Sequence, residues 1–293
     1  MFAGTETAIG IDVGGTRIRA ARIDRAGTIL ERVIEPVASD RDGFCTQLLR
    51  LVGEVRDQTS NGVGVGIPGR VDVDRGAIKS TGNLDIAGLD LPGLVAMETG
   101  LPLRIENDAT MALLAEAHTR KKSSGVLLMV TVGTGIGGAT FIDGAPWYGG
   151  GQAGQFGHIV VAEDGPICNC GRRGCVETFS SGTALRHLVS EAGLRHDIQV
   201  EELLAQRSDG GKISAELLDR WARPFQRALE SLVSVIDPEL IVIGGGLGAS
   251  MMRALERIPN ESDWYQIPLV PALLGDDAGI IGAGLRCFSE QAP

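Results

Sequence analysis

The sequence predicts an α/β protein of two lobes, each built around its own β-sheet. With 293 residues, the chain exceeds what a single hydrophobic core usually organises, so two compact lobes are expected. The start of each half also carries the same pattern: an apolar strand, a tight turn of Gly and Thr, and a returning strand. This pattern occupies residues 9–18 and again residues 129–136. Such a repeat is typical of a duplicated fold.

Apolar runs and their spacing predict the elements of the first lobe. Short runs that end at Gly, Asp or Asn predict strands, and apolar residues at helical spacing predict helices. The expected strands are 8–13, 18–23, 28–37, 63–67 and 103–106, and the expected helices are 44–55 and 109–118. A last helix at 278–288 is expected to return and pack on this lobe.

The second half repeats the strand pairing and then becomes helical. Strands are expected at 126–132, 136–142 and 240–243, and helices at 182–192, 200–207 and 215–236, where Pro224 can kink the last. We therefore expect a smaller N-terminal lobe of residues 1–107 with 278–293. Residues 108–277 form the larger lobe, which holds the cysteine-rich loop and further glycine-rich turns.

Composition excludes several classes of protein. The net charge is −10 and the only basic run is Arg120–Lys122, whereas nucleic-acid binding relies on basic patches that meet phosphates. No apolar stretch is long enough to span a bilayer, and no signal peptide opens the chain. We expect a soluble, cytoplasmic protein with no nucleic-acid or membrane partner.

The most informative stretch is a loop with three cysteines. Cys168, Cys170 and Cys175 follow shortly after His158, and the glycines between them let the loop fold back on itself. Three thiols and one imidazole are the ligands of a closed tetrahedral zinc site. A disulfide or a redox thiol group is the alternative. The other two cysteines are far away in sequence, so the spacing favours structural zinc.

Glycine-rich turns after apolar strands predict phosphate binding. Gly14 and Gly15 offer backbone N–H groups with no Cβ in the way, Thr16 adds a hydroxyl, and Asp12 could hold Mg²⁺. A plain hairpin turn explains any one such motif equally well. Two further glycine-rich segments make a nucleotide site the better interpretation: Gly133-Thr134-Gly135 and Gly244-Gly245-Gly246.

A polar cluster follows the strand at 103–106. Glu106-Asn107-Asp108 lies at a strand-to-helix junction, where open α/β sheets usually bind ligands. Asp108 could simply cap the helix. Alternatively, it could act as the general base that accepts the proton of an attacking hydroxyl in phosphoryl transfer. Asn83, taken alone, shapes a turn.

Taken in order, these motifs resemble the ROK family of sugar kinases and related repressors, within the actin-like ATPase superfamily. The resemblance spans nearly the whole chain and rests on Asp12-x-Gly-Gly-Thr16, Gly66-Ile-Pro-Gly69, Asn83-Leu84, Glu106-Asn-Asp108, Gly133-Thr-Gly135, Gly157-His158 and Cys168-x-Cys-Gly-x-x-Gly-Cys175-x-Glu177. It implies two lobes of ribonuclease H-like, duplicated fold, each with a mixed five-stranded sheet, around an ATP and sugar cleft, with a zinc-binding loop.

The resemblance also implies roles for single residues. Asp108 would be the general base, His158 would serve both zinc and sugar, and the sugar hydroxyls would be held by Gly69, Asn83, Asn107, His158 and Glu177. Two positions depart from the family pattern. Arg17 replaces the usual Lys near the phosphates, and Gln155 replaces the Glu common in glucokinase-like members. A glutamine brings donors and no charge, so it alters the grip on the sugar.

The sequence therefore predicts an ATP- and Mg²⁺-dependent hexose kinase with structural Zn²⁺, acting on the 6-hydroxyl. Glucose is the expected substrate, N-acetylmannosamine or another amino-hexose is the alternative, and polyphosphate is an alternative donor. A sugar-responsive repressor would carry an N-terminal DNA-binding domain, whereas the kinase-like motifs begin at once. A catalytically dead sugar sensor conflicts with the presence of both Asp12 and Asp108. The resemblance implies a homodimer.

Overall fold

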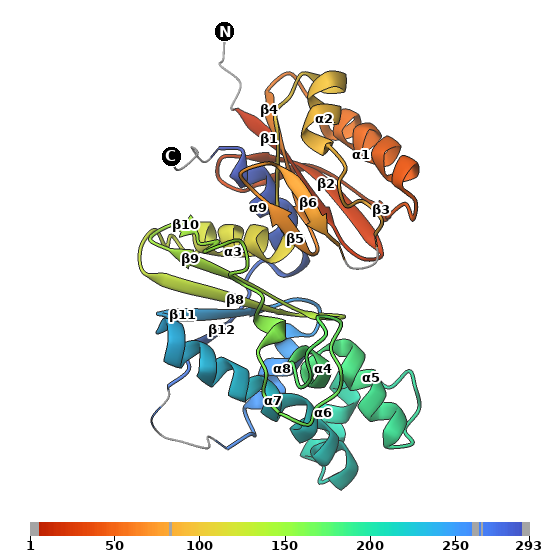
Figure 1. Cartoon of the computed structure of the whole chain (residues 1–293), viewed down its shortest axis with the longest axis vertical. Coiled ribbons are helices and arrows are strands. Elements are labelled where there is room, and N and C mark those ends of the chain that lie inside the picture. Colours follow the sequence, from red (N-terminus) through yellow and green to blue (C-terminus); the bar gives the residue numbers. More distant parts are fainter. Residues whose placement is uncertain (1–5, 82–83, 260–263, 265, 289–293) are drawn as a thin grey trace. The chain divides into compact units, whose positions relative to one another are not determined.

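A computed structural model describes residues 6–81, 84–259, 264 and 266–288. Contacts divide the chain into two compact units (Figure 1). The first comprises Met1–Ser123, Gly144–Gln152 and Asp276–Pro293, and the second comprises Ser124–Asp143 and Ala153–Gly275. The first unit extends beyond the expected boundary at residue 107 because helix α3 (Asp108–Thr119) packs on helix α9 (Ala278–Arg286).

The first unit holds a five-stranded mixed sheet of order β3-β2-β1-β4-β7. Its strands are β1 (Thr7–Val13), β2 (Arg17–Asp24), β3 (Ile29–Pro36), β4 (Ser60–Ile67) and β7 (Leu103–Asn107). β1, β2 and β3 form an antiparallel meander, whereas β4 and β7 run parallel to β1. All five predicted strands are present. A small antiparallel ribbon of β5 (Arg70–Asp72) and β6 (Ala77–Ser80) follows β4.

Helices cover both faces of this sheet. Helix α1 (Arg41–Val55) packs on β2 and β3 and buries Phe44 and Leu48 in the apolar core of this unit, and α2 (Leu91–Thr99) packs beside it. On the other face α9 lies directly on the strands. A Cβ at Gly10 or Gly64 would stand only 2.0 or 1.8 Å from a carbonyl oxygen of α9, so the glycines permit this close contact. The C-terminal helix therefore returns to the first unit, as predicted.

The second sheet repeats the first strand by strand. Its order is β10-β9-β8-β11-β12, with β8 (Val126–Val132), β9 (Ile136–Ile142), β10 (Ala145–Pro146), β11 (Leu240–Gly244) and β12 (Leu269–Pro271). β8 and β9 form an antiparallel hairpin, and β11 and β12 run parallel to β8. The same order, and the same directions of β9, β8, β11 and β12 as of their counterparts in the first sheet, confirm the predicted duplication.

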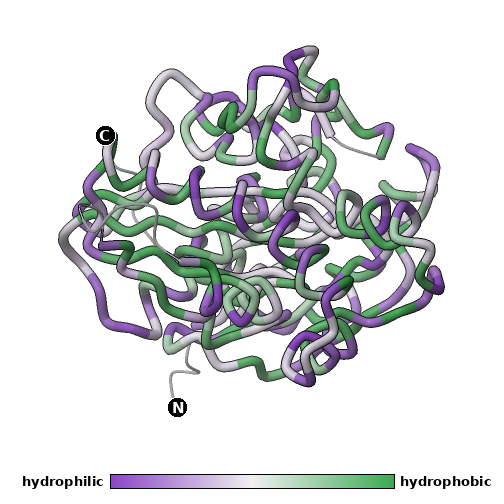
Figure 2. Tube along the Cα trace, turned by 90° about the horizontal axis from the view of Figure 1, so that it is seen from below, coloured by the Kyte–Doolittle hydropathy of each residue, from purple (hydrophilic) through white to green (hydrophobic). Residues whose placement is uncertain are grey.

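The second unit also contains the helices α4 (Glu177–Ser180), α5 (Gly182–Glu191), α6 (Val200–Ser208), α7 (Lys212–Ile236) and α8 (Gly248–Leu255). α7 continues through Pro224 and buries Trp221 and Phe225 at the centre of this unit's core. Hydrophilic and hydrophobic segments alternate along the helices (Figure 2), as expected where one helix face is buried. Across the described part of the chain, every helix is too short or too polar for a membrane crossing.

Candidate active site and metal-binding loop

The first sheet brings the acidic motifs to one edge. Asp12 stands near the carboxyl end of β1 and pairs in register with Gly66 of β4. Gly66 pairs in turn with Glu106 of β7, so the Glu106-Asn107-Asp108 motif ends at the same edge. The carboxyl ends of parallel strands are where α/β sheets bind ligands. The motifs predicted at 12 and 106–108 are therefore assembled within one unit.

Asn107, and not Asp108, caps helix α3. The Asn107 Oδ1 atom accepts hydrogen bonds from the backbone N–H groups of Ala109 at 3.0 Å and Thr110 at 3.3 Å. Its Nδ2 donates to the Gly69 carbonyl at 2.9 Å. Asp108 is consequently the first helical residue, and one of its oxygens accepts from the Ala109 N–H at 2.9 Å. Helix capping therefore does not account for the aspartate at 108.

The surroundings of Asp108 favour its protonated form. Burial, followed by the negative charge of Asp12, raises the pKa of Asp108 to about 7. Burial likewise raises the pKa of Asp12, and the ion pair with Arg19 opposes that rise. The Arg19 guanidinium lies 2.9 Å from the Asp12 carboxylate. Sequence reasoning missed Arg19, although the hairpin register that places it opposite Asp12 follows from the short turn between β1 and β2.

The structure does not single out Gly69 or Asn83, two of the predicted sugar ligands of the first unit, as sugar-binding residues. Gly69 has φ of 118°, and a Cβ there would stand 2.2 Å from the Ser80 carbonyl oxygen. The ribbon β5–β6 therefore requires glycine at this position whether or not a sugar touches it. Asn83 lies outside the described residues.

The two glycine turns are closed in the same way. The Gly14 N–H donates to the Arg17 carbonyl at 2.8 Å, and the Gly133 N–H donates to the Gly135 carbonyl at 2.9 Å. The first glycine amide of each turn is thus engaged within the turn. Gly15, Thr16 and Arg17 are exposed, so the groups of the first turn that can meet a phosphate come from these three residues.

In the second unit, neighbouring segments hold the Gly133–Gly135 turn in place. The Gly182 N–H donates to the Gly133 carbonyl at 2.8 Å, and the Thr183 hydroxyl donates to the Thr134 carbonyl at 2.9 Å. The loop that carries Gly244-Gly245-Gly246 is tied to the strand before the turn, because the Leu247 N–H donates to the Val132 carbonyl at 2.9 Å. Gly245 and Gly246 are exposed. Both predicted glycine-rich segments of this unit therefore lie together.

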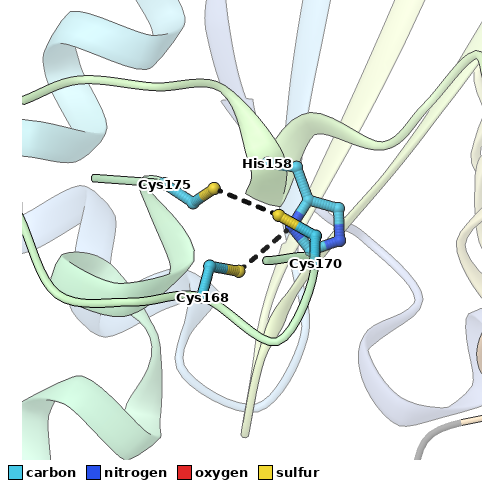
Figure 3. Close-up of side chains that lie close together, drawn as sticks. All are labelled: His158, Cys168, Cys170 and Cys175. Atoms are coloured by element: carbon cyan, nitrogen blue, oxygen red, sulfur yellow. Dashed lines mark hydrogen bonds between the residues drawn. The ribbon is translucent and has the colours of Figure 1, made fainter. Parts of the chain in front are cut away.

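The predicted metal ligands converge. One ligand atom from each of His158, Cys168, Cys170 and Cys175 lies within 4.8 Å of all the others (Figure 3). The Cys168 sulfur is 3.4 Å from His158 Nδ1, and the Cys170 and Cys175 sulfurs are 3.6 Å apart. Tetrahedral zinc with Zn–S bonds of about 2.3 Å separates its sulfur ligands by about 3.8 Å, whereas a disulfide needs about 2.05 Å. The donor set fits zinc and not a disulfide.

The remaining predicted ligands surround this loop. Gln155 precedes the short helix η1 (Phe156–His158), and its side chain has no hydrogen-bond partner among the described residues. Because His158 turns Nδ1 toward the thiols, its Nε2 is left for another partner. Glu177, at the start of α4, accepts a hydrogen bond from the Ile136 N–H at 2.8 Å. No sequence signal indicated this last contact.

Comparison with known proteins identifies the family. The sequence profile of the ROK family matches residues 8–286. The chain belongs to the ROK family. The glucokinase of Halalkalibacterium halodurans is 30% identical, over 94% of this chain and 93% of that protein. An N-acetylmannosamine kinase of Vibrio cholerae is 33% identical, over 96% of this chain and 99% of the relative.

A solved ROK structure shows the same fold. The ROK glucokinase of Streptomyces griseus, crystallised with glucose and AMPPNP, superposes with a TM-score of 0.79 at 28% identity. The match covers 94% of this chain and 97% of that one. The actin-like ATPase fold predicted from the sequence, with its α/β sheets and helices, is confirmed, and it carries the Cys and His cluster described above.

Proposed function

We propose that this protein transfers the γ-phosphate of ATP to the 6-hydroxyl of a hexose, with glucose as the first candidate. The chain is an ATP-dependent sugar kinase, because its family and its near full-length relatives, named glucokinase and N-acetylmannosamine kinase, are sugar kinases. The observation that carries the finer proposal is Asp108, a carboxylate at the ligand-binding edge of the first sheet with a pKa raised to about 7.

Asp108 serves as the general base. In the proposed step the sugar O6 attacks the γ-phosphorus, the bond to ADP breaks, and the O6 proton passes to the Asp108 carboxylate. A base works best when its pKa is near the working pH, since it is then both ionised and basic enough. Asn107 supports this role by taking over the helix cap, which keeps the carboxylate at the first position of α3.

The nucleotide is assigned to the glycine turns. Asp12, beside the exposed Gly15, Thr16 and Arg17, would hold Mg²⁺, which neutralises phosphate charge when it is bound with ATP. Asp12 already has one cationic partner, because Arg19 lies 2.9 Å from it. In the second unit the Gly133–Gly135 turn and the neighbouring glycines 244–246 offer a second set of backbone donors.

The zinc loop is assigned to the sugar. His158, Cys168, Cys170 and Cys175 would hold Zn²⁺ as a closed, structural site. With Nδ1 turned toward the Cys168 thiol, His158 would present Nε2 to a sugar hydroxyl, and Gln155 lies three residues before it with a free amide. A neutral amide can donate to an acetamido carbonyl, which a carboxylate cannot. Gln155 therefore favours N-acetylmannosamine or another amino-hexose as the second candidate.

A coupled assay of ADP release tests the proposal. Glucose, mannose, glucosamine and N-acetylmannosamine are each offered with ATP and Mg²⁺, and the phosphorylated position is read from the isolated product. We expect turnover with at least one of these sugars and a 6-phosphate as the product. ADP release that is independent of every sugar, or a product phosphorylated elsewhere, would contradict the proposal.

A further inference from the structure

We infer that Glu177 is a positioning residue for the nucleotide, in addition to any contact it makes with the sugar. Through Glu177 the zinc loop fixes the Gly133–Gly135 turn. This inference rests on the proposed function, in which that turn meets the phosphates of ATP. It concerns residues of the second unit only.

The first step is the contact itself. Glu177 Oε2 accepts a hydrogen bond from the Ile136 N–H at 2.8 Å, and Ile136 is the residue directly after the turn. The carboxylate also lies against Gly135, where a Cβ would stand 2.5 Å from Oε2. A hydrogen bond from a backbone amide to a carboxylate is charge-assisted and stronger than one between neutral groups. The half-buried carboxylate therefore holds the end of the turn.

The second step connects this contact to the metal ligands. Glu177 follows the ligand Cys175 by two residues and opens helix α4. The Val176 N–H between them donates to the Ile159 carbonyl at 2.8 Å, and Ile159 follows the ligand His158. Glu177 is thus anchored to both parts of the zinc loop. A change in the zinc loop is therefore expected to shift the Glu177 carboxylate.

The third step is that residues 182–183, which follow α4, form further hydrogen bonds with the Gly133–Gly135 turn. Just after α4, Gly182 and Thr183 donate to the carbonyls of Gly133 and Thr134. The Trp221 indole N–H donates to the Ser181 carbonyl at 3.1 Å and ties this point to the core. Residues 177–183 therefore hold the turn at both ends, with its carbonyls bound by α5 and the following N–H bound by Glu177.

Glu177 has an oxygen to spare for the sugar. The described residues provide no hydrogen-bond partner for Oε1, whereas Oε2 is engaged with Ile136. Glu177 can therefore contact the sugar and position the turn at the same time. The two roles predict that different binding steps are weakened when Glu177 is replaced. A sugar ligand affects sugar binding alone, whereas a positioning residue affects nucleotide binding when no sugar is present.

The experiment measures binding of AMPPNP with Mg²⁺ by calorimetry, without sugar, together with the zinc content of each protein. We expect Glu177→Ala to weaken AMPPNP binding about tenfold, the effect of losing one charge-assisted hydrogen bond. Glu177→Gln retains an acceptor oxygen and should bind within about threefold of the wild type. Thr183→Val, which removes only the hydroxyl bond to Thr134, should weaken binding by about threefold.

Thr178→Ala is the matched control. It removes a hydrogen bond to the Cys175 carbonyl in the same helical turn but touches neither Ile136 nor the glycine turn, so AMPPNP binding should not change. If Glu177→Ala binds AMPPNP like the wild type, or if Glu177→Gln is as weak as Glu177→Ala, the inference is wrong. Equal weakening in Thr178→Ala would also overturn it, because general disruption of the loop would then explain the loss.

The proposed function can fail separately. If the dependence of AMPPNP binding on Glu177 stands while no sugar is phosphorylated, the positioning role survives and the assigned kinase reaction does not. A wild-type protein that binds no AMPPNP would overturn both.

Discussion

Asp108 stands near enough to Asp12 that burial, and after it the negative charge of Asp12, raises the pKa of the Asp108 carboxyl to about 7. Arg19, 2.9 Å from Asp12, favours the ionised form of the Asp12 carboxylate. The ionisation of the candidate base, which opens helix α3, therefore depends on a residue of strand β1.

The first prediction concerns the pH dependence of the rate. kcat/KM should rise with pH, level off above about 7, and fall about tenfold per pH unit below that, because only ionised Asp108 accepts the proton. Asp12→Asn removes the like charge, so this acid limb should move to lower pH even if the rate itself drops. Asp74→Asn, a change at an exposed site in the same unit, should leave it in place. An acid limb at one pH in all three proteins would show that Asp12 does not act on Asp108.

The second prediction concerns stability. Asp108 has a folded-state pKa of about 7 against an ordinary value of 3.8, so the folded state binds the proton more tightly than the unfolded state. Folding therefore loses stability as pH rises from about 4 to 7, and the cost is fully present above that range. Asp108→Asn should remove the cost and raise the free energy of unfolding at pH 8 by roughly 2–4 kcal/mol, with little gain at pH 4. Urea unfolding at both pH values measures this. An equal effect at the two pH values would contradict it.

The third prediction concerns the metal. Purified protein should contain about one zinc per chain, because the four ligands form one closed site. Cys170→Ser should lose zinc, melt at lower temperature and lose activity, since the loop that carries His158 and Glu177 is no longer anchored. Cys45→Ser changes a cysteine of helix α1 in the first unit that is not one of the four ligands, and this variant should keep its zinc. Metal analysis and thermal melts of the three proteins measure these effects. Full activity of a metal-free protein would refute the structural role of zinc.

The fourth prediction concerns the sugar. If Gln155 contacts the sugar as proposed, the site lacks one charge-assisted hydrogen bond to a hydroxyl, worth roughly 1.5–3 kcal/mol, and gains a donor for an acetamido carbonyl. Gln155→Glu should therefore raise the ratio of kcat/KM for glucose over N-acetylmannosamine by about one to two powers of ten. Gln152→Glu adds the same charge at an exposed position three residues earlier and serves as the control. An unchanged ratio in Gln155→Glu would remove this residue from sugar selection.

Much of this architecture was predictable because its signals are local. The strands, the two hairpins with their Gly and Thr turns, and the Cys and His cluster each depend on residues close in sequence. Helix α2 was missed because Pro92 and Gly93 resemble a turn. The residues that cap this helix could have indicated it in the sequence. Asp90 accepts a hydrogen bond from the Gly93 N–H at 2.9 Å, and Gly100 ends the helix with φ of 71°.

The parts of the site that escaped prediction depend on contacts distant in sequence. The contact of Glu177 with Ile136 joins residues 41 positions apart. The raised pKa of Asp108, at the start of helix α3, depends on burial and on Asp12, which lies on strand β1. Whether Asp108 or Asn107 caps α3 also could not be decided from the residue types, since both are common N-caps. The bond from Asn107 to Gly69 favours Asn107 as the cap, because it fixes that side chain.

The most direct test of the central claim is the initial rate of sugar 6-phosphate formation by Asp108→Asn at pH 8, with saturating ATP, Mg²⁺ and the preferred sugar. Asparagine cannot accept the O6 proton, so we expect a loss of about 10²- to 10⁴-fold in kcat. Sugar binding, measured separately by calorimetry, should stay within about threefold of the wild type. Asp74→Asn should turn over normally. An Asp108→Asn enzyme that retains near wild-type kcat would show that Asp108 is not the base.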